Sequence, residues 1–278
     1  MFTLSVIIPT ILKDLELLQR AIDSVLLDNG IEVSVIVVND NSEVDITSVT
    51  ELKRYLTQNV VFYNNEGKSR AAGARNFGVT RAESDLITFL DDDDFILPGR
   101  LKSMMACYSE KKSNNIVLIS TGRLYEYNNF QRVEVVKKQI FGQLKLTDIY
   151  VHNQIDIGFL VEKKLFQSLN GFDTSFTNLE DWDFIIRCLE HGDAYKIKSY
   201  SYMVKNDTDS SRVSNNDHLG LSELGCKHKS KFGNQWFYKI KTQELRALNR
   251  LNFFEACKLS LKTKSAYPIK NYLAILCK

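Results

Sequence analysis

The sequence predicts an α/β fold with a Rossmann-like, mostly parallel central sheet, helices on both faces of the sheet and a helical C-terminal extension. Strand-like and helix-like segments alternate over residues 1–100, and this order favours parallel strands joined by right-handed crossovers. Two polar clusters, at residues 39–42 and 91–94, directly follow expected strands. Ligands bind beyond the carboxyl ends of the strands in such sheets, so we expect both clusters at the ligand-binding edge.

Apolar periodicity places the individual elements. Short runs rich in apolar and β-branched residues predict buried strands at residues 4–9, 33–38, 60–63 and 86–90. Helical spacing of apolar residues, or richness in alanine and arginine, predicts helices at residues 15–26, 49–56 and 69–82. The pattern is less regular after residue 101, where we expect a strand at 117–120, part of a hairpin at 133–136, a helix at 181–191 and a polar loop at 205–217.

Composition narrows the class of protein. The chain has 278 residues, of which 44% are hydrophobic and 25% charged, ordinary values for a globular protein with a sizeable core. Its net charge of +2 gives no global reason to expect a nucleic-acid partner. Five scattered cysteines without a CxxC pair argue against a disulfide framework and a zinc site. No basic segment precedes the first apolar run, and no run approaches the roughly 18 apolar residues of a membrane span, so we expect a cytoplasmic protein.

Charge is unevenly distributed along the chain. From Lys227 onward, twelve lysines and arginines face two glutamates, which gives this segment a charge of +10 and leaves −8 for the rest. Aromatic residues lie among these cations. We therefore expect a main domain at residues 1–225, with halves at 1–100 and 101–225, and a basic helical extension at residues 226–278.

An acidic run, Asp91–Asp94, ends one of the expected buried strands. Four adjacent carboxylates repel one another and raise each other's pKa unless a positive group lies among them. A divalent cation such as Mg²⁺ or Mn²⁺ is a natural compensator, because it prefers carboxylate and phosphate oxygens. A solvated acidic turn is the alternative, and the position at the expected ligand edge favours the metal.

Two acidic residues, Glu180 and Asp181, lie in the first turn of an expected helix whose apolar stripe includes Ile185, Ile186 and Leu189. The helix dipole stabilises acidic residues there, which is one explanation for the pattern. The other is that a carboxylate held at a helix start acts as a general base. These residues alone leave both explanations open.

Residues 66–78 combine small side chains with cations at an expected helix start. Such a start suits a diphosphate or the face of a nucleotide. The glycine spacing fits neither a Walker A loop nor a GxGxxG fingerprint, and basic residues on an exposed helix often bind nothing. This motif predicts a binding site only together with the acidic run Asp91–Asp94 and the pair Glu180 and Asp181.

In this order, the motifs resemble the family-2 glycosyltransferases of GT-A fold, of the type that builds bacterial surface polysaccharides. The resemblance covers roughly residues 4–190 and is carried by Ser5–Thr10, Val37–Ser42, Ala74–Asn76, Leu90–Asp94 and Leu179–Asp181. It implies that residues 1–225 are the catalytic domain, with a nucleotide-binding half followed by an acceptor half.

The resemblance also implies roles on the donor side. Asp40 matches the aspartate that contacts the nucleotide base, and Pro9 and Thr10 match residues that line the same pocket. Arg70 and Arg75 match basic positions of the helix beside the nucleotide. The implied donor is a nucleotide diphosphate sugar, most often a UDP-sugar in this family.

Further implied roles concern the metal and the reaction. Asp91–Asp93 match the DxD element, in which Asp93 binds Mn²⁺ or Mg²⁺ and Asp91 or Asp92 lies on the ribose side. Asp181 matches the base that deprotonates the acceptor hydroxyl, with Glu180 in support. Such enzymes invert the anomeric carbon in one displacement, and Trp182, beside the base, is a candidate for stacking on an acceptor sugar or for plain packing.

One departure from the family pattern affects the metal site. Many members carry a histidine after the catalytic helix, but the corresponding stretch, residues 202–207, has none. His218 is a weak substitute, so the metal would rest on Asp93, the diphosphate and water. Arg212, in the same expected loop, is a candidate partner of the diphosphate or a plain surface residue.

The expected acceptor is a glycan or lipid-linked glycan. The basic extension is either a helical cover of the catalytic domain or a surface that holds the enzyme at an anionic membrane. Its apolar residues would then face the membrane interface: Leu245, Leu248, Phe253, Phe254 and Leu261. Two other functions remain open at this point, a metal-dependent nucleotidyltransferase and a non-catalytic nucleotide or glycan binder.

Overall fold

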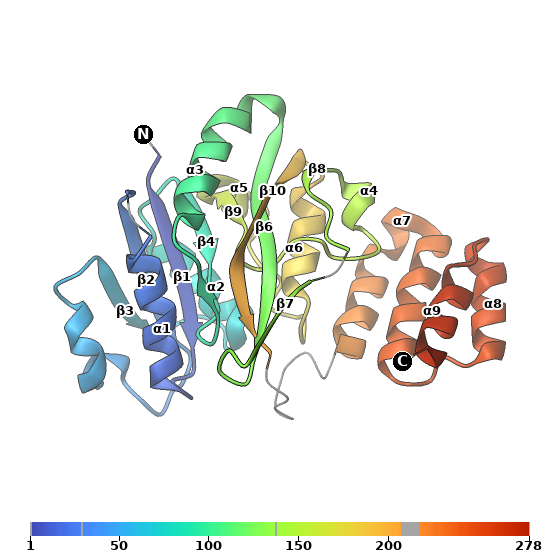
Figure 1. Cartoon of the computed structure of the whole chain (residues 1–278), viewed down its shortest axis with the longest axis horizontal. Helices are drawn as coiled ribbons and strands as arrows, with labels where there is room; N and C mark the ends of the chain where they lie inside the picture. Colours follow the sequence, from blue (N-terminus) through green and yellow to red (C-terminus); the bar gives the residue numbers. More distant parts are fainter. Residues whose placement is uncertain (1, 29, 137, 207–216, 278) are drawn as a thin grey trace. The chain divides into compact units, whose positions relative to one another are not determined.

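The computed structural model describes residues 2–28, 30–136, 138–206 and 217–277. In these residues, ten strands form one sheet in the order β3-β2-β1-β4-β9-β6-β10-β5, with β7 paired to β6 and β8 paired to β10 (Figure 1). The strands are β1 Leu4–Thr10, β2 Val33–Asn39, β3 Val60–Asn64, β4 Leu86–Phe89, β5 Phe95–Ile96, β6 Ile116–Tyr127, β7 Arg132–Val135, β8 Gly142–Leu144, β9 Leu160–Glu162 and β10 Asp193–Lys205.

The predicted N-terminal strands are confirmed, and they pair in parallel. β1 lies between β2 and β4, with Thr10 opposite Asn39 and Ile7 opposite Phe89. All seven residues of β1 are buried, as expected for a strand covered on both faces. The chain continues with antiparallel pairings of β9 to β4 and β6, so the second half of the sheet is mixed.

Helices alternate with the strands along the chain and then follow them, and the predicted α/β fold class is confirmed. They are α1 Leu15–Leu26, α2 Arg70–Arg81, α3 Arg100–Lys111, α4 Leu146–Ile149, α5 Lys163–Ser168, α6 Glu180–Cys188, α7 Asp217–Ala247, α8 Phe253–Thr263 and α9 Tyr267–Leu276. Helix α2 packs closely on β1, because a Cβ at Gly78 would lie 2.6 Å from a methyl group of Ile7. The helix expected at residues 49–56 is instead a short 3₁₀ segment, Thr50–Tyr55, whose buried Leu52 and Tyr55 are three residues apart.

After residue 101 the structure contains strands that the apolar pattern did not predict. The strand expected at 117–120 is part of the twelve-residue β6, and it forms the expected hairpin with β7. The long β10 was not predicted; it pairs with β6 in parallel and with β8 and β5 in antiparallel orientation. Most of the polar loop expected at 205–217 lies outside the described residues.

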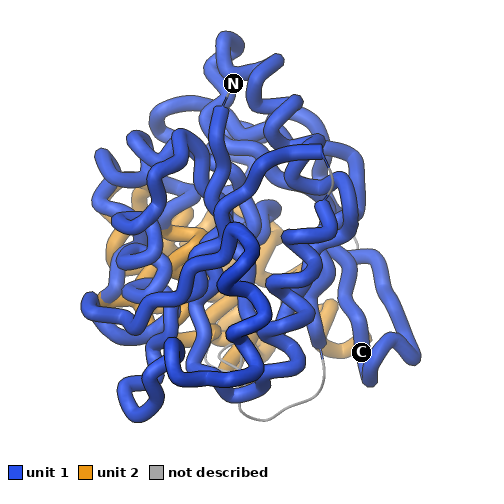
Figure 2. The backbone as a smooth tube through the Cα atoms, turned by 90° about the vertical axis from the view of Figure 1, so that its left-hand side faces the viewer, with its two compact units in different colours: residues 1–174, 184–208 blue, residues 175–183, 209–278 orange. Residues whose placement is uncertain are grey.

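The chain divides into two compact units, which Figure 2 colours separately. The first comprises residues 1–174 and 184–208, and therefore holds the sheet. The second comprises residues 175–183 and 209–278, which include the start of α6 and all of α7, α8 and α9. The boundary predicted at residues 225 and 226 lies within α7 and stays a prediction.

The second unit has a small core of its own. Buried Leu251, Ala256 and Leu259 pack with aromatic and aliphatic side chains from α7 and α9. Helix α7 is interrupted at Gly233, whose φ of +78° lies in the left-handed region that favours glycine. Among the described residues, no helix combines the length and apolar character that a bilayer crossing requires.

Candidate functional site

The sheet register brings three of the predicted motifs to one edge of the first unit. The loops after β1, β2 and β4 begin side by side, since Asp40 donates its backbone N–H to the carbonyl of Thr10 (2.7 Å) and Leu90 donates to Ile7 (3.1 Å). Pro9 lies opposite Val38 in this register and is buried. The polar residues that follow the strands therefore share the edge that was predicted for them.

Asp40 holds the start of α2. One carboxylate oxygen accepts the backbone N–H of Arg70 at 2.6 Å, and the other accepts a side-chain N–H of Asn65, also at 2.6 Å. Arg70 has a φ of +72°, a conformation that a residue with a side chain adopts only at an energetic cost. The contact with Asp40 stabilises this conformation, and a carboxylate keeps further acceptor capacity for a ligand.

The two arginines of α2 have different surroundings. Arg70 is exposed, whereas Arg75 is only 5% exposed and its guanidinium lies 2.5 Å from the carboxylate of Asp91. The guanidinium also lies over the ring of Phe172, 5.8 Å from its centroid. Arg75 is thus placed to orient the first aspartate of the acidic run, while Arg70 is placed at the surface.

Asp92 is connected to the first strand. Thr10 donates its hydroxyl to Asp92 at 2.6 Å, and the same hydroxyl oxygen accepts the N–H of Leu12 at 2.9 Å. Burial raises the pKa of Asp92 to about 6, the charges of Asp93 and Asp91 add to the increase, and the hydrogen bond from Thr10 opposes it. Asp92 is therefore protonated more readily than an exposed aspartate.

The fourth aspartate has another role. Asp94 is buried and accepts the backbone N–H of Lys205 at 3.0 Å, which connects the acidic run to β10. Burial, and then the charges of Asp93 and Asp91, raise its pKa well above the ordinary value. Asp94 is a structural anchor, and the half-buried residues Asp91–Asp93 are the ones that face a ligand edge.

A clamp that the sequence did not reveal holds the loop at Asp93. Arg20 of α1 donates to the carbonyl oxygen of Asp93 at 2.7 Å and to the fully buried carboxylate of Glu126 at 3.2 Å. Its guanidinium also lies 4.7 Å from the ring centroid of Phe95. Arg20 and Glu126 are 106 positions apart, so no local pattern identifies them as partners.

The oxygen chemistry of the acidic run fits a hard divalent cation. Three consecutive aspartates are half-buried here, and burial, with the neighbouring charges, raises the pKa of Asp92, an effect that a bound cation would oppose. Within the described residues, however, no three side chains of histidine, cysteine, aspartate or glutamate gather as a ready-made metal cage. Mg²⁺ often takes only one or two carboxylates from a protein and completes its shell with phosphate oxygens and water, so the aspartates of the run are the residues that would hold such a cation.

The predicted base belongs to the second unit. Asp181 lies in the first turn of α6 with Glu180 and accepts the backbone N–H of Trp182 at 2.7 Å. Leu179, just before the helix, has a φ of +63°. Trp182 is 3% exposed, which favours the packing interpretation over stacking on an acceptor. Arg212 lies outside the described residues, and His218 is half-buried in the first turn of α7.

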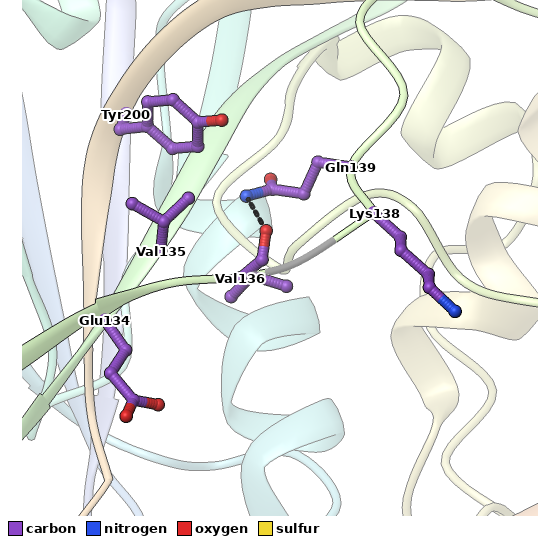
Figure 3. A pocket seen from close by; sticks show the side chains of 6 residues that line it. All are labelled: Glu134, Val135, Val136, Lys138, Gln139 and Tyr200. Atoms are coloured by element: carbon purple, nitrogen blue, oxygen red, sulfur yellow. Dashed lines mark hydrogen bonds between the residues drawn. The ribbon is translucent and has the colours of Figure 1, made fainter. Parts of the chain in front are cut away.

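A hollow elsewhere on the first unit contains none of these residues. Figure 3 shows this cavity of about 440 Å³, with Tyr200 and Val135 on one side and Gln139 and Lys138 on the other. The side-chain amide of Gln139 donates hydrogen bonds to the backbone carbonyls of Val136 and Arg123. The carboxylates at the strand ends, and not this hollow, are therefore the candidate active site.

The fold is that of a glycosyltransferase of GT-A type. Residues 5–169, more than half of the chain, match the family described as Glycosyl transferase family 2, and the chain belongs to that family. The fold resembles that of TarS from S. aureus in complex with UDP-GlcNAc, with a TM-score of 0.65 and 15% identity over 97% of this chain and 89% of that one.

Two curated relatives share about a quarter of their aligned residues with this chain. A β-1,3-glucosyltransferase of Campylobacter jejuni, named for the acceptor GalNAc(5)-diNAcBac-PP-undecaprenol, is 26% identical over 98% of this chain and 85% of its own length. An uncharacterised glycosyltransferase of Haemophilus influenzae is 22% identical over 67% of this chain. The chain spans 62% of the length of that relative.

Proposed function

We propose that this enzyme is an inverting, metal-dependent glycosyltransferase that moves a sugar from a UDP-sugar to a hydroxyl of a lipid-linked glycan in bacterial surface-polysaccharide synthesis. The observation that carries the proposal is the convergence of Thr10, Asp40 and Asp91–Asp93 at one strand edge in a family-2 fold. The UDP-GlcNAc complex of TarS and the undecaprenol-linked acceptor in the name of the C. jejuni relative support the donor and acceptor classes.

The residues divide the chemistry between donor and acceptor. Asp40 and the pocket of Pro9 and Thr10 bind the nucleoside, and Arg75 orients Asp91 toward the ribose side. A cation bound at Asp93 would neutralise the charge that develops on the diphosphate leaving group.

Proton transfer occurs on the acceptor side. As the acceptor oxygen forms its bond to the anomeric carbon and the bond to the diphosphate breaks, Asp181 takes the hydroxyl proton. Glu180, the neighbouring acid of the same helical turn, supports the base. A single displacement of this kind inverts the anomeric configuration.

The test is incubation of the purified enzyme with labelled UDP-sugars and Mn²⁺, with and without a polyprenyl-diphosphate-linked glycan. We expect acceptor-dependent transfer, or slow donor hydrolysis when the acceptor is absent. A thermal-shift screen selects the donor first, because a ligand at a hundred times its Kd stabilises the fold by roughly 2.7 kcal/mol. Nucleotide exchange, or binding without any turnover, would contradict the proposal.

A further inference from the structure

The outer face of α8 is both apolar and cationic. Phe254 and Leu261 are each 82% exposed and lie seven residues, or about two helical turns, apart on the same side of the helix. The opposite side buries Ala256 and Leu259 in the core of the second unit. Two large apolar side chains exposed together on one face of a helix mark it as a candidate binding face.

The surrounding charge identifies the chemistry of that partner. Lys258 lies between the two apolar residues on the exposed face, and Lys262 and Lys264 are exposed beside Leu261. Glu255 is the acidic residue of α8 whose charge opposes that of these lysines. A symmetric dimer through this face would bring the +10 charge of one C-terminal segment against that of the other, whereas an anionic surface is complementary.

We propose that this face of α8 is an interfacial binding site for an anionic lipid bilayer. Phe254 and Leu261 enter the headgroup and acyl boundary, and Lys258, Lys262 and Lys264 meet lipid phosphates. The site deepens the proposed function by bringing the enzyme to the surface where a lipid-linked acceptor lies. Binding to lipid is itself independent of the reaction, so the two proposals fail separately.

Co-sedimentation of the full chain with vesicles tests the site. Wild type should sediment with vesicles that contain phosphatidylglycerol, should release at high salt, and should ignore pure phosphatidylcholine. Phe254→Ser with Leu261→Ser should weaken binding about tenfold or more, and Lys258→Glu with Lys262→Glu by a similar factor, since each cation near such a surface contributes roughly fivefold.

The matched control is Leu56→Ser, which removes a 66% exposed leucine from the first unit and should not change vesicle binding. Donor hydrolysis without acceptor should stay unchanged in all of these variants, which separates loss of lipid binding from loss of fold. Wild-type protein that ignores anionic vesicles at low salt would overturn the site. So would a serine double variant that binds like wild type, or one that instead dissociates an oligomer.

A second inference rests on separate contacts within the second unit, between the first half of α7 and the chain around the start of α6. Glu223 accepts both the backbone N–H and the hydroxyl of Thr177, each at 2.8 Å. Asp183, which is fully buried in the first turn of α6, lies 2.9 Å from Lys227 Nζ and 2.8 Å from His228 Nε2. These contacts fix the backbone on both sides of Asp181.

Close approach of the two segments depends on a glycine. A Cβ at Gly220 of α7 would lie 2.1 Å from Asn178 Oδ1 and 2.5 Å from the carbonyl oxygen of Asn178. The side chain of Asn178 donates to Asp217 at 3.0 Å, and the next residue, Leu179, has the left-handed conformation described above. The segment that leads into α6 therefore follows the surface of α7 residue by residue.

We infer that the first half of α7 positions Asp181, with Lys227 and His228 acting through Asp183. This inference rests on the proposed role of Asp181 as the base. The contacts hold a helical turn that directly follows Leu179, whose left-handed conformation is unfavourable for a leucine. Lys227 and His228 are positioning residues, since nothing assigns them contact with a substrate.

Lys227→Met and His228→Gln test this role. Each should lower kcat about tenfold while KM and Kd for the donor stay unchanged, and Lys227→Arg should recover most of the rate because it retains a cation beside Asp183. Lys229→Met is the matched control, an exposed lysine on the same helix, and should behave as wild type.

A double-mutant cycle with Asp181→Asn separates positioning from general weakening of the fold. In the Asp181→Asn background, Lys227→Met should have almost no further effect on the rate, because the group that it positions no longer accepts a proton. An equal further loss would overturn the positioning role without touching the proposed function. Full activity of Asp181→Asn would instead overturn the function, and the inference with it.

Discussion

The two units hold their acidic residues in different ways. In the first, Asp40, Asp91 and Asp92 lie after β2 and β4, the strands on either side of β1, and each is fixed by a partner from β1 or α2 at that edge. In the second, the turn that carries Asp181 is fixed by a helix that begins more than thirty residues later in the sequence. The proposed donor side thus depends on strand register, which is hard to alter, whereas the position of the proposed base depends on tertiary contacts that single side chains control.

Loss of Asp93, the proposed metal ligand, should have the largest effect. We expect Asp93→Ala to abolish transfer and to remove the Mn²⁺-dependent stabilisation by UDP, because the proposed cation would no longer be held beside the diphosphate. Turnover and thermal shifts with and without Mn²⁺ measure both effects. Glu83→Ala, an exposed acid elsewhere in the first unit, serves as the control, and metal-dependent activity near wild type in Asp93→Ala would contradict the metal site.

The second-largest effect is expected at Asp181, the proposed base. Asp181→Asn keeps the size of the side chain but removes the proton acceptor, so kcat should fall roughly a hundredfold or more while donor Kd stays nearly unchanged. Steady-state kinetics and donor titration give the two numbers. If donor affinity falls as much as kcat, Asp181 belongs to the donor side, and the contrast between the two units is wrong.

A smaller change is expected from the arginine that orients the acidic run. Arg75→Met removes the charged partner of Asp91, which is 34% exposed and can be solvated in its place. Hydrogen bonds to charged groups contribute about 1.5–3 kcal/mol, so we expect donor Kd to rise roughly tenfold or more, with a smaller change in kcat at saturating donor. The reverse pattern, a fall in kcat alone, would place Arg75 with the chemical step.

The smallest effect concerns a buried lysine away from the strand ends. Burial lowers the pKa of Lys196 from 10.5 to about 8, so between these values the unfolded chain binds a proton that the folded chain has released. Stability contributed by Lys196 therefore rises with pH across that window, by up to about 1.4 kcal/mol per pH unit. Urea unfolding across this range should show a shallower rise for Lys196→Met, with donor kinetics unchanged; equal pH slopes would contradict the lowered pKa.

Local patterns predicted the first half of the molecule well. Buried strands such as β1 are short apolar runs, and polar residues directly after them fall at a sheet edge by geometry alone. The pairing of Arg20 with Glu126 leaves no such trace, because the partners meet only after the sheet has formed. The same holds for Asp183 and His228, which are 45 positions apart. The 3₁₀ segment at Thr50–Tyr55 was expected as an α-helix, because apolar residues recur every three or four positions in both kinds of helix.

The glycine at the break in α7 separates two halves of the helix that make different contacts. A Cβ at Gly233 would meet nothing within 4 Å, so conformation alone, and no packing contact, demands a glycine there. Residues before the break hold the turn of Asp181, and residues after it pack with the helices that expose Phe254 and Leu261. During evolution, a break of this kind lets the helices after it be exchanged, which changes the surface that an enzyme binds. The half of the helix before the break meanwhile keeps the geometry of the proposed active site.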